Sequence, residues 1–551
     1  MRNQRRLSGL AVAFALSAKL AAQDPADRVQ ACQEAQALLG TVAKFPLQAP
    51  ARELRLEAGH KELFIDDHAV AELHGVRRQM HTPRKFGPVI RPDRPWEGDS
   101  IQVRTGPFWN PGEKQWMLWY LGGYATSRDG VAWEKPMLGL RDYKGSKQNN
   151  LMLPVTRYEF KDPLTGREIL RQDGDGITVN HAIYDAAETN PARRYKGAAH
   201  KGPLCCVPGG RGAGFYPAVS PDGRSWQVLD TAFVPTADES HFNLDEERRF
   251  YFATVKHNGP YGRSVYLSVS TDFDHWTDPR DCLIFHADKR DQDLGAARVQ
   301  MHLRDENLRK PAFHRPGEYV TDIYNLPVFR YEGLYLGLPT VFNHSGNSRV
   351  NSDGFSMAEL ASSRDLMHWD RIGNREKFIP LSGLDGERNY DTAQLLAANR
   401  PIIKDGEIWF YYTGLKWRHH PDDVQSEDYV SRPDTGAICL AKLRLDGFVS
   451  LDAGSTAGTV VTKPFVIASG ESLRINANAT AGGEIDAEIQ DGQTGRVVKG
   501  FSIAESVPVS GDKLDGELRW RSGAKVASLA GRTVKLRFSI RQASLYAFWT
   551  Q

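Results

Sequence analysis

The chain has 551 residues, more than one hydrophobic core usually serves, so two or more domains are expected. Hydrophobic residues make up 40% and charged residues 25%, a balance that excludes a disordered or fibrous chain. The 70 basic and 68 acidic residues leave a net charge of +2, so neither nucleic acid nor an anionic membrane is expected as a partner.

The first 22 residues have the pattern of an export signal. Three arginines within residues 1–6 precede an apolar run over 7–18, and small residues follow at Ala21 and Ala22. The run is too short to span a bilayer. A buried amphipathic helix fits less well, because polar residues do not recur at helical spacing. We therefore expect a signal peptide at 1–22 and a secreted or periplasmic protein, with no membrane-spanning segment further on.

Residues 23–60 are expected to form a leader helix and a linker, since helix formers such as Ala31, Glu34 and Leu38 gather there. The five cysteines fit no metal-ligand spacing and are too few for a disulfide-rich scaffold. One disulfide and buried free thiols both stay open. No metal is expected, because the spacing of His419-His420 and Asp422-Asp423 favours a solvated loop. No cofactor is expected, because the glycines at 210–214 lack the strand and helix that a dinucleotide site requires.

From residue 62 onward, short runs rich in Val, Ile, Tyr, Phe and Trp alternate with Gly, Pro, Asn and Asp. This pattern predicts many short strands joined by turns. The pattern Ser-x-Asp-x-x-x-Trp occurs there four times, at Ser127–Trp133, Ser220–Trp226, Ser270–Trp276 and Ser363–Trp369, with a degenerate fifth copy at 445–448. The Asp can accept hydrogen bonds from the backbone of the turn, and the Trp can pack between sheets. We interpret the motif as structural. Its count predicts a five-bladed β-propeller over residues 61–453.

A second domain is expected after the propeller. Val534, Leu536, Phe538 and Ile540 alternate with polar residues, as in a half-buried strand. Glycines separate this segment from several others of the same kind. Residues 454–551 are therefore predicted to form a β-sandwich, and the fold class is all-β.

Three segments carry a family resemblance. Residues 62–67 (Glu-Leu-Phe-Ile-Asp-Asp), 127–133 and 446–451 resemble secreted bacterial propeller proteins of the glycoside hydrolase family 32/43/130-like superfamily. The resemblance implies a propeller followed by a sandwich, and activity on carbohydrate. The family 32 motifs Trp-Met-Asn-Asp-Pro-Asn, Arg-Asp-Pro and Glu-Cys are absent, which argues against fructan hydrolysis.

Carboxylates open the expected first strand of each blade, and first strands line the funnel of a propeller. These residues are Asp99, Asp175, Asp238 with Glu239, Asp322 and Asp391. Glycosidic cleavage needs one acid to protonate the leaving oxygen and one carboxylate to activate water or attack the sugar. We predict Asp99, Glu239 and Asp322 as catalytic. By the resemblance, Asp99 takes the place of the base, Asp175 of a helper and Glu239 of the acid. Acids at strand starts also cap turns, which is the alternative for each.

The predicted substrate-binding residues could bind sugar hydroxyls, or a carboxylate or sulfate on the sugar. They are Asp175, Asp238, His241, Arg104, Arg263, Tyr324, Asn325 and Asp391. A surface or inter-blade role is the alternative for each of these side chains.

The sequence predicts a secreted glycoside hydrolase, exo-acting on a poly- or oligosaccharide by carboxylate acid/base catalysis in the funnel. Two alternatives stay open. One is a non-catalytic carbohydrate-binding propeller. The other is an inverting glycoside phosphorylase, for which Arg104, Lys256 and Arg263 could supply a phosphate site. Two carboxyl groups facing one pocket would distinguish a hydrolase from a binding module.

Overall fold

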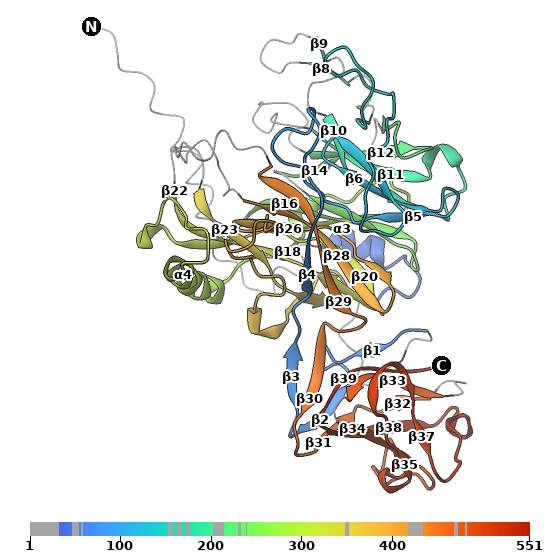
Figure 1. Ribbon diagram of the computed structural model, residues 1–551. Coiled ribbons are helices and arrows are strands. Elements are labelled where there is room, and N and C mark those ends of the chain that lie inside the picture. Colours follow the sequence, from blue (N-terminus) through green and yellow to red (C-terminus); the bar gives the residue numbers. More distant parts are fainter. Residues whose placement is uncertain are drawn as a thin grey trace.

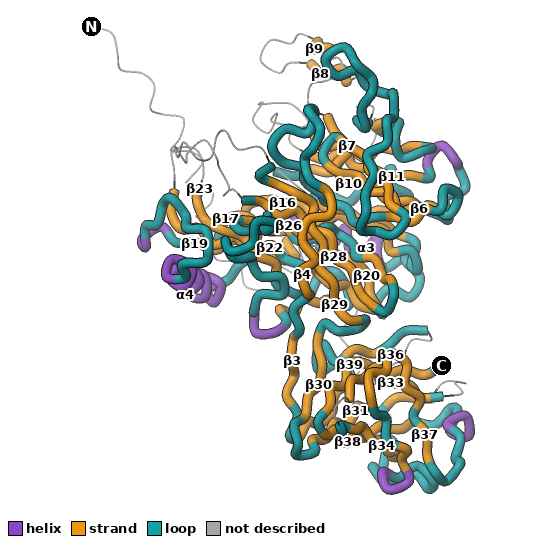
Figure 2. The backbone as a smooth tube through the Cα atoms, viewed as in Figure 1, coloured by secondary structure: helices purple, strands orange, loops and turns teal. Residues whose placement is uncertain are grey.

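The computed structural model describes residues 32–46, 54, 56, 59–152, 158–161, 168–171, 177–201, 214–229, 233–237, 240–347, 352–416, 434–467, 472–479 and 482–551. The predicted signal peptide lies outside these residues. Strands dominate the described part (Figure 2), and its only α-helices are α3 (Gln33–Leu39) and α4 (Lys289–Arg304). The all-β prediction is confirmed. Neither of these helices has the length and hydropathy of a membrane span.

Antiparallel sheets follow one another along the chain in the upper part of Figure 1. The first contains β5 (Phe108–Asn110), β6 (Gln115–Tyr120) and β7 (Gly123–Ser127). The second contains β10 (Ile177–Tyr184), β11 (Tyr195–Lys201), β12 (Gly214–Ser220), β13 (Gln227–Val228) and β14 (Val234–Pro235). The third contains β15 (His241–Asp245), β16 (Phe250–Gly259), β17 (Gly262–Ser270) and β18 (Leu283–Phe285). A separate hairpin pairs β8 (Tyr158–Lys161) with β9 (Glu168–Arg171).

Prolines split the next part of the chain into two sheets. One contains β19 (Val320–Asn325), β22 (Thr340–Asn347) and β23 (Ser352–Ala358), and the other β20 (Val328–Tyr331), β21 (Leu334–Gly337), β24 (Ala361–Ser363) and β25 (Asp370–Arg371). Pro327 and Pro339 lie at the break, where a residue without an N–H group interrupts the ladder. The carbonyl of Pro327 still accepts a hydrogen bond from Leu338, 3.0 Å away. The two sheets are therefore the halves of one bent sheet.

A strand from the N-terminal side completes the last sheet of this series. Here β26 (Gln394–Ala397), β28 (Glu407–Leu415) and β29 (Gly436–Arg444) are followed by β4 (Arg84–Ile90), while β27 (Ile402–Lys404) pairs with β28. Lys85 on β4 forms an ion pair with the buried Asp391. Residues more than 300 positions apart are thus joined in one sheet, and β4 lies in the upper part of the molecule in Figure 1, beside β28 and β29.

The C-terminal part has two sheets. One contains β2 (Val70–His74), β31 (Gly458–Thr462), β38 (Thr533–Arg541), β32 (Phe465–Val466) and β34 (Glu484–Asp491). The other contains β3 (Arg77–Met80), β30 (Val449–Ala453), β39 (Ala543–Thr550), β33 (Leu473–Ala479), β36 (Gly511–Glu517) and β1 (Glu62–Leu63). A short pair of strands, β35 (Ser506–Val507) and β37 (Arg519–Trp520), lies beside them.

The two C-terminal sheets share one hydrophobic core. Val534, Leu536, Phe538 and Ile540 alternate inward along β38, each with no exposed surface, as their spacing predicted. Strands β1 to β3 pair with C-terminal strands, although the sequence grouped residues 61–80 with the repeats. The reason is that their ladder partners lie more than 360 residues away, as for Met80 and Val449, and more than 480 away for Glu62 and Phe548, beyond the range of local patterns.

The four Ser-x-Asp-x-x-x-Trp turns contain the predicted hydrogen bonds between Asp side chains and the turn backbone. The four Asp side chains accept hydrogen bonds from two backbone N–H groups each, at 2.8 to 2.9 Å. Trp226 is fully buried, whereas the other three tryptophans are half-buried. The degenerate fifth copy also forms a turn, but its Asp446 carboxylate accepts bonds from Lys61, Tyr331 and Asn476 in other segments.

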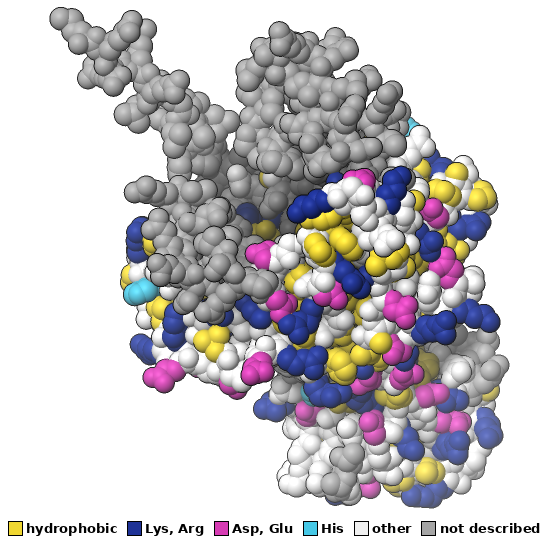
Figure 3. Space-filling model, turned by 45° about the horizontal axis from the view of Figure 1, so that its top comes forward, with side chains coloured by type: hydrophobic (Ala, Val, Ile, Leu, Met, Phe, Trp, Pro, Cys, Tyr) yellow, Lys and Arg dark blue, Asp and Glu magenta, His cyan; other side chains and the backbone are white. Residues whose placement is uncertain are grey.

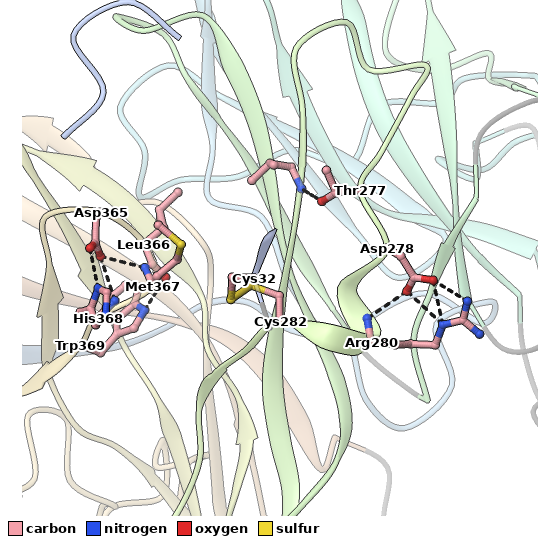
Figure 4. The surroundings of a disulfide bond; sticks show 11 residues. Cys32, Thr277, Asp278, Arg280, Cys282, Asp365, Leu366, Met367, His368 and Trp369 are labelled. Carbon is pink, nitrogen blue, oxygen red and sulfur yellow. Dashed lines mark hydrogen bonds and ion pairs between the residues drawn. A yellow bond between two sulfur atoms is a disulfide. The ribbon is translucent and has the colours of Figure 1, made fainter. Parts of the chain in front are cut away.

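Helix α3 is held by a disulfide between Cys32 and Cys282 (Figure 4). Its buried residues Ala35 and Leu39 belong to a core that includes Phe250 on β16. Both possibilities left open for the cysteines occur among the described residues: Cys32 and Cys282 form a disulfide, and Cys439 is a buried free thiol. The leader helix lies within its predicted range.

Candidate active site

The first strands of successive sheets meet through buried polar side chains. Thr105 Oγ1 accepts a hydrogen bond from the backbone N–H of Ala182 at 3.2 Å, which links the first two sheets. Asn243 on β15 donates to the carbonyls of Val328 and Asn399, at 3.1 and 3.0 Å. Asn399 donates back to the carbonyl of Phe242 at 2.5 Å. These bonds join strands that are far apart in sequence, so the first strands of the sheets lie next to one another.

Asp322 on β19 is the most constrained carboxylate of the site. It is 3% exposed, and Arg263 on β17 binds both of its oxygens, with Nε to Oδ2 at 2.8 Å and Nη2 to Oδ1 at 3.0 Å. His344 Nε2 lies 3.1 Å from Oδ2. Burial alone would raise the pKa of Asp322, but the charges and hydrogen bonds of Arg263 and His344 hold it well below its usual range. Such a carboxylate stays ionised and is a poor proton donor, so its place is that of an anchor for Arg263.

Cations stack on aromatic rings next to this ion pair. Lys256 Nζ lies 3.6 Å from the centre of the Tyr324 ring, and Arg263 Cζ lies 4.7 Å from it. Arg263 Cζ is also 4.8 Å from the centre of the Phe342 ring. Lys256 is 2% exposed and Tyr324 9%. Cation–π contacts of this kind are strongest where water is excluded.

Histidines and a second arginine extend the site towards the first two sheets. The rings of His181 on β10 and His241 on β15 are 5.2 Å apart. Burial, and then the charges of Arg104 and Lys256, lower the pKa of His241 to about 3, so this ring is neutral. Arg104 is 2% exposed and donates to Gln102 Oε1 at 2.7 Å. Residues from four successive sheets are therefore brought together.

Asn325 supplies unused hydrogen-bonding capacity next to Tyr324. Its side-chain oxygen and nitrogen are both buried without a hydrogen-bond partner in the described part of the chain. A buried amide without partners costs free energy, and ligand sites are places where such groups occur. The Asn325 amide is therefore a candidate ligand-binding group, as the sequence predicted.

The structure brings together five of the predicted site residues, and Asn325 lies beside them. These five are Arg104, His241, Arg263, Asp322 and Tyr324. Asp99 is exposed in a turn, where its backbone carbonyl accepts a bond from Thr435 at 2.7 Å. Asp175, Asp238 and Glu239 lie outside the described residues.

Asp391 has a structural partner in place of the predicted sugar. It is 3% exposed, pairs with Lys85 and accepts a bond from the Tyr412 hydroxyl at 3.3 Å. Lys85 also donates to Ser382 at 2.8 Å. The prediction that Asp391 binds substrate is therefore not supported, because the carboxylate is occupied in holding β4 in its sheet.

Three contributors were missed from the sequence: His181, Phe342 and His344. Phe342 and His344 alternate on β22 and so share one face, a signal that the sequence offered. Their position opposite Asp322 depends on the pairing of β22 with β19, which no local pattern predicts. Among the described residues, no group of three or more His, Cys, Asp or Glu is placed to hold a metal ion.

Known structures similar to this chain are glycoside hydrolases, which agrees with the resemblance stated from the sequence. One, a glycosyl hydrolase from Bacteroides ovatus, has 14% identity and a TM-score of 0.37, covering 70% of this chain and 97% of its own. Another, the Bombyx mori family 32 β-fructofuranosidase, has 11% identity and a TM-score of 0.34, covering 84% and 93%. A third belongs to family 130, described as mannoside phosphorylases that include hydrolases, with 12% identity, a TM-score of 0.34 and coverage of 68% and 94%.

No protein-family profile matches the chain, and no curated protein matches it. At these identities and TM-scores, the function has to be argued from the side chains of the site.

Proposed function

We propose that this protein is a secreted glycoside hydrolase, exo-acting on a poly- or oligosaccharide, with its substrate site at the axis of a five-bladed β-propeller. The blades would be the successive sheets from β5 to β29, with the two sheets around Pro327 and Pro339 counted as one blade and with β4 closing the last. The two C-terminal sheets would form the β-sandwich.

One observation carries the proposal: buried polar and charged side chains from four sheets converge beside the strand starts. Arg104, His181, His241, Lys256 and Asp322 are buried, where a polar group is costly, and the half-buried Arg263 and aromatic rings lie among them. Such groups are retained where a polar ligand uses them. Polyhydroxylated sugars suit this set, since donors, acceptors and an aromatic face are all present.

The acid/base roles are assigned from the chain positions. Glu239 precedes His241 by two residues, so we assign it as the proton donor, and Asp99 as the base that activates water. Asp175 and Asp238 are assigned to substrate binding. Asp322 is given no proton-transfer role, because its lowered pKa makes it a poor proton donor and a weak base, and Arg263 binds both of its oxygens.

Secretion is supported by the disulfide as well as by the N-terminal pattern. The bond between Cys32 and Cys282 forms and persists in oxidising compartments, whereas cytosolic thiols are kept reduced. We therefore place the mature protein outside the cytosol.

An inverting glycoside phosphorylase is the second candidate function, because Lys256 and Arg263 lie together at the site. A phosphorylase replaces water by inorganic phosphate, which needs cations beside the scissile bond. The observation that separates the two is whether product release depends on phosphate.

The test is a product screen with the purified protein against plant and algal polysaccharides and their oligosaccharides. We expect release of a small sugar by the wild type, and a loss of about 10²–10⁴-fold in turnover for Glu239→Gln. Glu246→Gln is the matched control, since Glu246 is an exposed acid just after β15. Its turnover should stay within about twofold of the wild type.

Three results would contradict the proposal. Equal rates for Glu239→Gln and the wild type would remove Glu239 from the mechanism. Release of a sugar phosphate only in the presence of inorganic phosphate would favour the phosphorylase. Sugar binding without any turnover would favour a binding module.

A further inference from the structure

A groove on the C-terminal part of the chain lies far along the sequence from the candidate active site. It has a volume of about 550 Å³, within the range of small-ligand sites, and we call it the Arg496 groove. Its lining includes Asp491, Arg496, Val497, Lys499, Leu529 and Arg532.

Backbone hydrogen bonds fix both walls of the groove. In the hairpin after β34, the Asp491 N–H donates to the carbonyl of Arg496 at 2.8 Å, and Gly495 donates back to Asp491 at 2.9 Å. Gly492 donates to the carbonyl of Thr533 at the start of β38, which ties the hairpin to the opposite wall. The groove is therefore preformed, and a ligand would lose little free energy in shaping it.

Charge in the groove is unbalanced. Arg496, Lys499 and Arg532 supply three cations, and Asp491 is the one acid among the lining residues. Asp491 is engaged in its own turn, since Oδ1 accepts from the N–H and the hydroxyl of Thr494, both at 2.9 Å, and Arg532 lies 3.6 Å from Oδ2. In the described part of the chain, Arg496 and Lys499 form no ion pair. Two cations thus remain for an anionic ligand.

An apolar floor accompanies these cations. Phe501 and Leu529 are buried beneath the groove, and Val497 presents its side chain at the surface, 46% exposed. Arginine binds carboxylate or sulfate groups through two parallel hydrogen bonds, and apolar side chains pack against the C–H faces of sugar rings. On the face that Figure 3 shows, Lys and Arg side chains are intermixed with acidic ones.

We propose that the Arg496 groove binds the acidic groups of a polysaccharide, either uronate carboxylates or sulfate esters. This inference rests on the proposed function and extends that function by naming the substrate class, an acidic polysaccharide. A polymer bound there would be held on the same molecule as the active site, which raises its effective concentration.

The experiment uses the full mature chain in affinity electrophoresis and calorimetry. The probes are polygalacturonate, a sulfated galactan and a neutral galactan. We expect binding to at least one acidic polymer and none to the neutral one. The double variant Arg496→Glu, Lys499→Glu should weaken that binding by about tenfold or more.

The matched control is the double variant Lys513→Glu, Arg519→Glu. It makes the same change in net charge at two exposed positions of the same part of the chain. Its affinity for the acidic polymer should stay within about twofold of the wild type. The uronate and sulfate arms identify which acidic group is recognised.

The proposal is overturned if no acidic polymer binds, if the control loses as much affinity as the groove variant, or if double-stranded DNA binds as tightly as the acidic polysaccharides. Hydrolysis of short oligosaccharides, measured separately, should be unchanged in the groove variant. If the wild type hydrolyses nothing but the groove still binds acidic polymer, then the proposed hydrolase fails while this inference stands.

Discussion

At the scale of residues, the site is built on charges that are buried in pairs. The Asp322 carboxylate accepts two hydrogen bonds from the Arg263 guanidinium, which in turn stacks on the rings of Tyr324 and Phe342. Removing one partner of a buried pair leaves the other charge uncompensated, which is far more costly than losing an exposed pair. This pairing fixes the guanidinium in one orientation, as a substrate-positioning group requires.

The buried His241 should make stability depend on pH. Its pKa in the folded protein is lowered to about 3, against about 6.5 in an unfolded chain, chiefly by burial. Between those values the unfolded state binds a proton that the folded state does not, so stability falls as the pH falls through this window. We expect His241→Gln to flatten the slope of unfolding free energy against pH by up to about 1.4 kcal/mol per pH unit.

Urea unfolding at pH 7, 6, 5 and 4 measures this slope. His275→Gln is the control, because its pKa is raised by hydrogen bonding to Asp272 and its side chain is exposed, so it should not flatten the slope. Identical slopes for the wild type and His241→Gln would show that this ring is not buried in its neutral form.

At the scale of elements, helix α3 depends on its disulfide. The helix has only seven residues, which is too short to be stable alone, and it has no side-chain hydrogen bond at its N-cap, Cys32. Two of its side chains pack against the core around β16, and Cys32 is bonded to Cys282 across 250 residues. The disulfide therefore supplies stability that so short a helix does not have by itself.

Breaking that link should destabilise the protein. For the double variant Cys32→Ser, Cys282→Ser, we expect the unfolding free energy to fall by about 2–5 kcal/mol, because the unfolded chain regains the freedom of a long loop. Urea unfolding without reductant measures the difference. Adding reductant should lower the stability of the wild type and leave the variant unchanged; a variant as stable as the oxidised wild type would refute the role of the bond.

At the scale of the whole molecule, Asp446 joins three separate parts of the chain. Its side chain is fully buried and accepts hydrogen bonds from Lys61 at 2.7 Å, Tyr331 at 2.5 Å and Asn476 at 2.6 Å. Tyr331 lies on β20 and Asn476 on β33, so the bonds connect the repeated sheets with the C-terminal sheets. The two parts of the molecule should therefore unfold together.

Asp446→Ala tests this coupling. Loss of the carboxylate leaves Lys61 and Asn476 without their shared acceptor, and we expect a cost of about 3–5 kcal/mol and two separate transitions in calorimetry. Asp512→Ala is the control, because Asp512 pairs with Arg444 at an exposed position between the same two parts and should cost less than about 1 kcal/mol. A single transition with unchanged enthalpy in Asp446→Ala would contradict the coupling.

Part of the site could be predicted from the sequence. Arg263, Asp322 and Tyr324 were found because they lie at strand ends in a repeating chain, where side chains from different sheets converge. Asp391 and Asp446 have structural partners that the sequence did not predict, since Lys85, Lys61 and Asn476 come from distant segments. A carboxylate looks the same in a sequence whether it faces a ligand or a buried lysine.

The sequence by itself determined the local features: the four Ser-x-Asp-x-x-x-Trp turns, the period-two strand at β38 and the all-β class. These depend on contacts between residues a few positions apart, whose chemistry can be read directly. Only the tertiary structure decided that β4 completes the last sheet, that β1 to β3 join the C-terminal sheets and that Asp322 holds Arg263. The physical reason is that strand pairing uses backbone groups that every residue has, so partners hundreds of residues apart are selected by the packing of the whole chain.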